Sequence, residues 1–201
     1  MSADEPGGSF ELASAALSES LLQTKLVPPQ SPVAEIERGA LLERLDRGRA
    51  GGLTLVVAAA GYGKTTLLAQ WRHRLAQGGA LVGWLTLDEN DADPLQLLSG
   101  VALALARAGV DLGPLESAAA KGFADVQPRA ALAALVGGIA RQGRPVVLIL
   151  DDYHRAQSPP IDRLVDLLIA HRPPGLHVVL SSRVRPDIAI SSLRAQGQAH
   201  E

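Results

Sequence analysis

Short apolar segments alternate with longer helical patterns along most of the chain. Runs of Leu, Val and other apolar residues cover 53–57, 80–87, 146–150 and 176–180, and such runs are typical of strands buried on both faces. Apolar residues recur every three or four positions over 65–76, 94–108, 128–142 and 161–170, which predicts helices. Strands that alternate with helices form a parallel sheet with helices on both faces. We therefore expect an α/β domain.

The residues before the first strand show weaker patterns. Residues 1–22 are predicted to be a tail with at most a short helix after residue 10, and residues 1–20 contain acids but no Lys or Arg, which excludes a signal peptide. Residues 23–52 form a lead-in segment with Pro28-Pro29 and a helical pattern over 35–47. Residues 53–201 form the core. No apolar run reaches the ~18 residues that a membrane span requires.

Composition narrows the class of protein. The 201 residues are 47% hydrophobic but only 3% aromatic, so the core must be aliphatic and is large enough for one domain. The net charge of −2 does not indicate a surface that binds polyanions. The chain has no Cys, which excludes disulfides and thiolate metal sites and fits a cytoplasmic setting.

The segment that joins the first strand to its helix carries the strongest chemical signal. It reads AAAGYGKT over residues 58–65. Glycines allow a tight turn with several backbone N–H groups facing one concavity, Lys64 adds a charge, and Thr65 adds a hydroxyl for a metal. The match to the pattern G-x-x-x-x-G-K-[ST] is incomplete because its first glycine falls on Ala58. An ordinary Gly-rich turn is the alternative, but it does not account for the flanking strand and helix. The residues predicted to hold a nucleoside triphosphate are Ala60, Gly61, Tyr62, Gly63, Lys64, Thr65 and Thr66.

Two carboxylates follow the apolar run 146–150. Asp151 and Asp152 come directly after this predicted strand, at the sheet edge where open α/β folds bind ligands. From position, we expect Asp151 to hold Mg²⁺ together with Thr65, and Asp152 to polarise an attacking water. A strand that ends in Asp is common by itself, but together with the loop it points to triphosphate hydrolysis.

Two arginines are further candidates for the same site. Arg183 follows the strand over 176–182 and is a candidate to contact the γ-phosphate, since a guanidinium matches phosphate geometry; a surface salt bridge is an equal alternative. Arg38 lies in the lead-in segment, where it either contacts the nucleotide or lies on a solvated helix face. The spacing favours the second interpretation of Arg38.

Other polar residues have simpler interpretations. The acidic loop 88–93 lacks the spacing of a calcium loop, and Asp93 before Pro94 is predicted to cap a helix. His154 and His177 have no partners at metal-ligand spacing. We expect both histidines to serve packing.

Several of these motifs together resemble a known family. The segments TKL (24–26), AGYGKTTLLAQW (60–71), WLTLD (84–88), LDDYH (150–154) and SSR (181–183) are similar to the ATPase module of MalT-like, LuxR-family transcriptional regulators. These are signal-transduction ATPases with numerous domains (STAND), within the AAA-like P-loop group. The resemblance runs from about residue 22 to residue 201, and it implies a P-loop NTPase fold with ATP and Mg²⁺ as cofactors.

The resemblance also implies parts that these 201 residues do not contain. Such regulators continue into a winged-helix segment, helical sensor repeats and a C-terminal helix-turn-helix that binds DNA. The family's ATPase core has a fifth strand beside the phosphate-loop strand, and residues 194–201 stop just short of it. We therefore expect a C-terminally truncated core with an exposed sheet edge.

The family suggests a switch rather than a metabolic enzyme. ATP would favour an assembly-competent state that self-associates through the ATPase module, and weak Mg²⁺-dependent hydrolysis would reset it. DNA would be contacted only through the missing helix-turn-helix, and no membrane is involved. Two other functions remain open: a small P-loop phosphotransferase, and a non-catalytic remnant that binds nucleotide without turnover.

Overall fold

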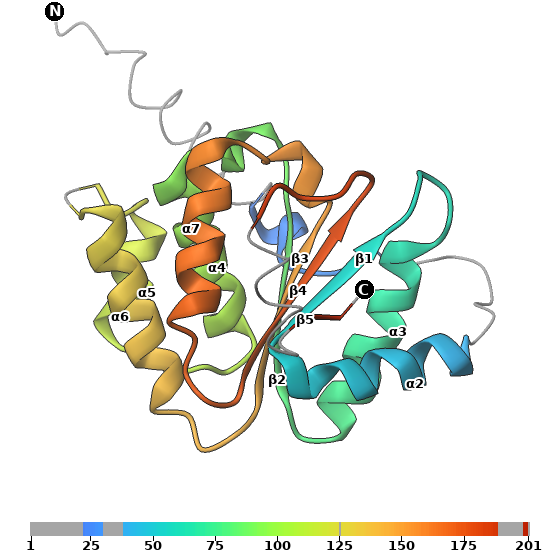
Figure 1. Cartoon of the computed structure of the whole chain (residues 1–201). Helices are drawn as coiled ribbons and strands as arrows, with labels where there is room; N and C mark the ends of the chain where they lie inside the picture. Colours follow the sequence, from blue (N-terminus) through green and yellow to red (C-terminus); the bar gives the residue numbers. More distant parts are fainter. Residues whose placement is uncertain (1–21, 30–37, 125, 189–198, 201) are drawn as a thin grey trace, which may run out of the picture.

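The centre of the molecule is a five-stranded parallel sheet (Figure 1). The computed structural model describes residues 22–29, 38–124, 126–188 and 199–200. The strands lie in the order β2-β3-β4-β1-β5. Their bounds are Leu53–Val57 for β1, Leu81–Thr86 for β2, Val146–Asp151 for β3, Leu176–Ser182 for β4 and Ala199–His200 for β5.

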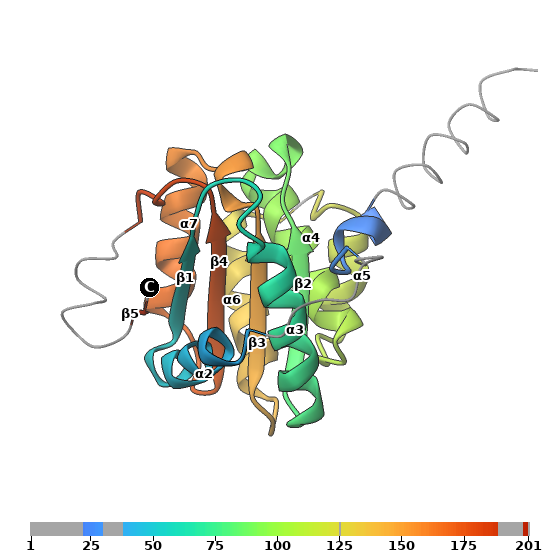
Figure 2. The same cartoon turned by 90° about the vertical axis from the view of Figure 1, so that its right-hand side faces the viewer.

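Helices cover both faces of the sheet (Figures 1 and 2). One face carries α2 (Gly39–Gly48) and α3 (Lys64–Gln77). The other carries α4 (Pro94–Arg107), α5 (Pro114–Ala120), α6 (Pro128–Ala140) and α7 (Pro159–Ala170). Two apolar clusters fill the spaces between sheet and helices. The smaller one lies under α2 and α3 and contains both tryptophans, Trp71 and Trp84. The α/β fold with a parallel sheet is confirmed.

Prolines and short polar side chains set where several helices begin. The helices α4, α5, α6 and α7 each have Pro in the first turn, where the missing N–H costs nothing. The carboxylate of Asp93 accepts hydrogen bonds from the N–H groups of Leu95 and Gln96 at 2.9 and 3.0 Å. The predicted role of Asp93 as a helix cap is confirmed.

Three short 3₁₀ helices also lie within the described residues: η1 (Arg49–Gly51), η2 (Glu89–Ala92) and η3 (Tyr153–Arg155). In η2 the acidic loop is tied to the lead-in segment, because the Lys25 ammonium bonds Asp91 and lies 3.2 Å from Asp88. The structure therefore gives these carboxylates a cationic partner from the chain itself. No helix in the described part is long and apolar enough to cross a membrane.

The strand pairing brings the chemical residues to one edge. The strands β1 and β4 pair in parallel with Val57 opposite Ser182, and β3 pairs with β4 with Leu150 opposite Leu180. The carboxyl ends of these strands therefore meet at the same edge of the sheet. From there the chain continues into the phosphate loop, the two aspartates and Arg183.

One expectation about the chain's end needs correction. Residues Ala199–His200 form β5 and pair in parallel with Leu53 and Thr54 of β1, so the described residues include a fifth strand beside β1. The pairing covers only the first two residues of β1. The weak helix expected after residue 10 and the start of the helix expected over 35–47 lie outside the described residues.

Candidate nucleotide-binding site

The phosphate loop between β1 and α3 has the conformation that its glycines allow. Gly61 and Gly63 have φ values of 81° and 75°, a left-handed region that L side chains rarely adopt. A side chain at Gly63 would also meet the guanidinium of Arg38, since an added Cβ would lie 2.8 Å from its Nη2. The helix α3 begins immediately afterwards at Lys64, so its N-terminus lies beside the loop.

Lys64 is held inside this loop by the loop's own backbone. Its Nζ donates to the carbonyl oxygens of Ala58 at 2.7 Å and Ala59 at 3.1 Å. The residue is only 9% exposed. The ammonium is therefore fixed at the concave side of the turn, where an oxyanion would replace neutral carbonyls with a stronger, charge-assisted partner.

Thr65 and Asp151 meet at the carboxyl end of the sheet, as predicted. The Thr65 hydroxyl donates to Asp151 Oδ2 at 2.8 Å. Asp151 is 1% exposed, and its other oxygen, Oδ1, is buried and has no hydrogen-bond partner among the described residues. A buried acceptor without a partner is costly, so Oδ1 fits a ligand of a cation or of its coordinated water.

The donor set also suits the metal. No group of three or more His, Cys, Asp or Glu side chains within the described ranges forms a site that could hold a metal by itself. Mg²⁺ in nucleotide sites is usually bound through one or two carboxylates plus phosphates and water. One carboxylate and one hydroxyl beside the phosphate loop fit that chemistry.

Asp152 and His154 form a second polar pair next to this one. Asp152 has a left-handed backbone with φ 56°, and its Oδ1 lies 3.9 Å from Nδ1 of His154. Burial lowers the pKa of His154; the Asp152 carboxylate opposes this, whereas Arg183, Lys64 and Arg155 lower it further. The imidazole is therefore neutral at neutral pH.

His154 is a site residue that the sequence interpretation missed. Its Nδ1 is buried and has no hydrogen-bond partner in the part of the chain that the structure describes, and charges from the phosphate loop and from the end of β4 act on it. Its position two residues after Asp152 was the available signal. His177, in contrast, is 3% exposed and bonded to Thr54 within the sheet, in agreement with a packing role.

Tyr153 fixes the segment that carries these residues. Its hydroxyl donates to Asp162 Oδ1 at 2.7 Å, and both residues are buried. Burial and the hydrogen bond to Asp162 raise the pKa of Tyr153, so the hydroxyl stays a donor. This bond ties η3 to α7 and thereby limits where Asp152 and His154 can lie.

The two candidate arginines come from different elements. Arg183 is exposed at the end of β4 and acts electrostatically on His154. Arg38 lies at the start of α2, and its Nη1 donates to the carbonyl oxygen of Tyr62 at 2.9 Å. The interpretation of Arg38 as a residue on a solvated helix face is therefore incomplete, because its side chain also contacts the backbone of the phosphate loop.

A cavity of about 320 Å³ lies between α2, β1 and the phosphate loop. Its wall is largely apolar, with Leu41, Leu45 and Leu67 among the lining residues, and Arg38 and Lys64 also reach it. An apolar cavity next to an anion-binding loop suits a ligand with a flat apolar part and a charged part.

The fold and this loop together define a P-loop nucleotide-binding domain of the α/β class. A family model described as "AAA ATPase domain" matches residues 35–180, which is most of the chain. The protein therefore belongs to the AAA ATPase domain family.

Curated relatives give a more specific likeness. The chain is 32% identical over 185 residues to the HTH-type transcriptional regulator MalT of Cronobacter sakazakii, and 33% identical over 181 residues to that of Serratia proteamaculans. In both cases the match covers 90% of this chain and 20% of the relative. The chain is thus homologous to an ATPase region and spans about a fifth of these regulators.

Solved structures resemble the fold at lower identity. The ORC1 protein of Aeropyrum pernix, in a complex with DNA, matches 76% of this chain and 40% of its own with a TM-score of 0.54 and 19% identity. Cdc6p from Pyrobaculum aerophilum matches 90% of this chain and 47% of its own with a TM-score of 0.53 and 16% identity. These likenesses show an AAA ATPase fold.

Proposed function

We propose that this domain binds Mg²⁺–ATP, hydrolyses it slowly, and serves as the nucleotide switch of a LuxR-family transcriptional regulator. The observation that carries the proposal is the hydrogen bond from Thr65 to the buried Asp151, whose other carboxylate oxygen has no partner among the described residues. This pair lies beside a loop whose carbonyl oxygens hold Lys64 in place. A turn with a purely structural role does not require a buried acceptor and a buried ammonium at one sheet edge, because the burial of charged groups lowers stability. A triphosphate with its metal uses both.

Each residue has a defined task in this proposal. The N–H groups of the phosphate loop and the Lys64 ammonium bind phosphate oxygens, and Thr65 and Asp151 hold the metal. Mg²⁺ supplies charge that stabilises the transferred phosphoryl group. Asp152 accepts a proton from the attacking water or orients it, and Arg183 provides positive charge near the terminal phosphate. Arg38 contacts the phosphate loop and borders the 320 Å³ cavity, which we assign to the adenine base of ATP.

His154 keeps Asp152 suitable for that task. A neutral imidazole 3.9 Å from the carboxylate does not form an ion pair with Asp152. Because an Asp locked in a salt bridge is a weaker proton acceptor, the lowered pKa of His154 supports a role of Asp152 in proton transfer.

The regulatory part of the proposal rests on the relatives. Those with 32% and 33% identity are named HTH-type transcriptional regulators, and this chain covers only 20% of each. DNA contact would then come from a helix-turn-helix outside these 201 residues, while this domain contributes ATP-dependent self-association. A small phosphotransferase has no specific observation in its favour here.

Phosphate release and nucleotide binding, measured in parallel, test the proposal. The purified chain is incubated with ATP in the presence of Mg²⁺ or of EDTA, and binding is followed with a fluorescent ATP analogue. We expect slow, Mg²⁺-dependent release that Asp152→Asn suppresses while binding stays intact, because the amide keeps the shape but cannot accept a proton. Asp187→Asn, at an exposed residue beyond β4, is the matched control.

Three outcomes would count against parts of the proposal. Turnover by Asp152→Asn at the parent rate would remove its assigned role. Binding without any phosphate release would favour the non-catalytic remnant. Phosphate that appears on an added acceptor instead of in solution would favour a phosphotransferase.

A further inference from the structure

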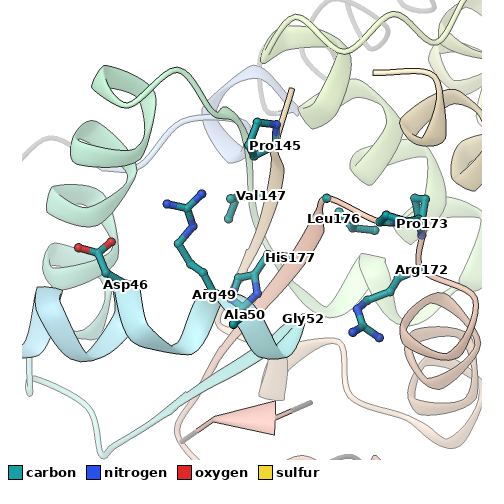
Figure 3. A pocket seen from close by; sticks show the side chains of 12 residues that line it. Asp46, Arg49, Ala50, Gly52, Pro145, Val147, Arg172, Pro173, Leu176 and His177 are labelled. Carbon is teal, nitrogen blue, oxygen red and sulfur yellow. The ribbon is translucent and has the colours of Figure 1, made fainter. Parts of the chain in front are cut away.

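A second cavity lies at the sheet edge opposite the phosphate loop, where the parallel strands begin. Its volume is about 620 Å³, and its lining includes Gly52 before β1, Pro145 before β3 and Leu176 at the start of β4. Figure 3 shows this cavity with Arg49 and Arg172 on either side of His177. None of the residues assigned to nucleotide binding lines it.

The segments that enter β1, β3 and β4 are strongly basic. The stretches 46–52, 141–145 and 171–175 together contain one acidic residue, Asp46. They contain five arginines, which are Arg47, Arg49, Arg141, Arg144 and Arg172. Asp46 also lines the cavity, but both of its oxygens are engaged. Oδ1 accepts from the indole of Trp71 at 2.8 Å, and Oδ2 lies 3.0 Å from Arg74. Its negative charge is therefore already matched.

The two arginines in the cavity lack such compensation. The Arg49 residue is half-buried, and its side chain makes no hydrogen bond or ion pair within the described ranges of the chain. Among the described residues, Arg172 donates only to the carbonyl oxygens of Ile169 at 3.5 Å and Gly51 at 3.4 Å, which are long distances for hydrogen bonds. Arg172 lies just after the C-terminus of α7, a position that favours cations. Because its two contacts are long, most of its N–H donors remain available to a ligand.

The backbone makes room for the Arg172 side chain. Gly52 has φ 87°, and a Cβ there would lie 2.1 Å from Arg172 Nε. A residue with a side chain at this position would therefore displace the guanidinium from the start of β1. Glycine at position 52 keeps the cationic group at the cavity wall.

The rest of the wall suits an organic ligand. Pro173, Leu176 and Val147 add apolar surface, and the buried His177 is fixed by its contact with Thr54, whose Oγ1 lies 3.0 Å from His177 Nε2. The volume lies within the range of small-molecule sites and exceeds what a bare oxyanion fills. We propose that this cavity binds a small organic molecule that carries a phosphate or carboxylate group, with Arg49 and Arg172 as the anion-binding residues.

Calorimetric titration of the full chain tests this site independently of nucleotide hydrolysis. The probes are phenyl phosphate and benzoate, with benzyl alcohol as the neutral counterpart, and the stronger anion identifies the preferred head group. We expect Arg49→Gln and Arg172→Gln each to weaken anion binding about 10-fold or more, because a charge-assisted contact is lost. Arg163→Gln, at an exposed α7 residue whose side chain has no bond within the described ranges, should leave anion binding unchanged.

The phosphate loop is the obvious competing site, and Lys64→Ala separates the two. Anion binding that survives Lys64→Ala but is lost with Arg49→Gln supports the cavity. Binding that Lys64→Ala abolishes and both arginine variants retain places the anion in the phosphate loop and overturns the proposal. Equal affinity for benzyl alcohol, or no anion binding at all, overturns it as well. Arg49→Gln removes no described bond, so its thermal unfolding midpoint should match the parent and exclude a folding defect.

Discussion

Replacement of Lys64 by Ala gives the most direct prediction about the nucleotide site. The change removes an ammonium that is 9% exposed and that donates to two carbonyls of the phosphate loop at 2.7 and 3.1 Å. In the proposed nucleotide complex the same group would face phosphate oxygens. The variant would therefore lose a contact between opposite charges in the complex, but only contacts with uncharged carbonyl oxygens in the free domain.

The expected magnitude follows from that difference. A hydrogen bond to a charged group contributes about 1.5 to 3 kcal/mol, so the affinity for ATP should fall roughly 10- to 100-fold. Ligand at ~100 times its dissociation constant stabilises the parent by about 2.7 kcal/mol, which for a domain of this size is a shift of roughly 5 to 10 °C. At the same ATP concentration the variant retains only about 0.4 to 1.4 kcal/mol, a shift of roughly 1 to 6 °C.

Thermal unfolding with and without Mg²⁺–ATP measures this effect. Lys121→Ala is the matched control, since Lys121 is exposed at the end of α5 and its side chain has no bond within the described ranges. The parent and the control should show the full ATP-dependent shift. An equal shift in Lys64→Ala would refute the assignment of the phosphate loop, whatever the absolute melting temperatures are.

Two further predictions concern the segment after β3. Tyr153→Phe leaves the buried Asp162 without its 2.7 Å donor, so it should lower the free energy of unfolding, measured by urea titration, by about 1 to 3 kcal/mol. The control Tyr62→Phe, at a side chain that is 68% exposed, should change this free energy little. Equal effects of the two variants would contradict this account. The folded protein binds a proton at His154 less readily than the unfolded chain, because the pKa is lowered from 6.5. The parent should therefore lose stability as pH falls below about 6.5, whereas His154→Gln should lose less over the same window; parallel pH profiles would exclude this contribution.

Much of the fold was predictable because its signals are local. The strands β1, β2, β3 and β4 are largely buried, so each appears in the sequence as a mainly apolar run, and 53–57 coincides with β1. The helix predicted over 65–76 begins one residue earlier and ends one residue later. The pairing of Ala199–His200 with β1 was not predictable, because a two-residue strand has no periodicity and is defined only by its neighbour.

The sequence by itself determined the chemistry of the phosphate loop. The spacing of Gly61, Gly63, Lys64 and Thr65 dictates a turn that ends in a helix, and a buried strand that ends in Asp151 must deliver its carboxylate to the same edge of a parallel sheet. These constraints act over a few residues or follow from the strand direction. The spacing of residues along the chain and the direction of the strands are therefore enough to predict both features.

Only the tertiary structure decided which distant groups share a site. The bond from Arg38 to the loop carbonyl of Tyr62, the neutral His154 beside Asp152, and the cavity that brings Arg49 and Arg172 together depend on how separate helices and strands pack. Burial and the charges of neighbouring elements set the properties of such groups, and no sequence window contains that information. The same argument applies to Asp151. Only the packing of the strands and helices around it shows that its Oδ1 is buried and has no hydrogen-bond partner among the described residues.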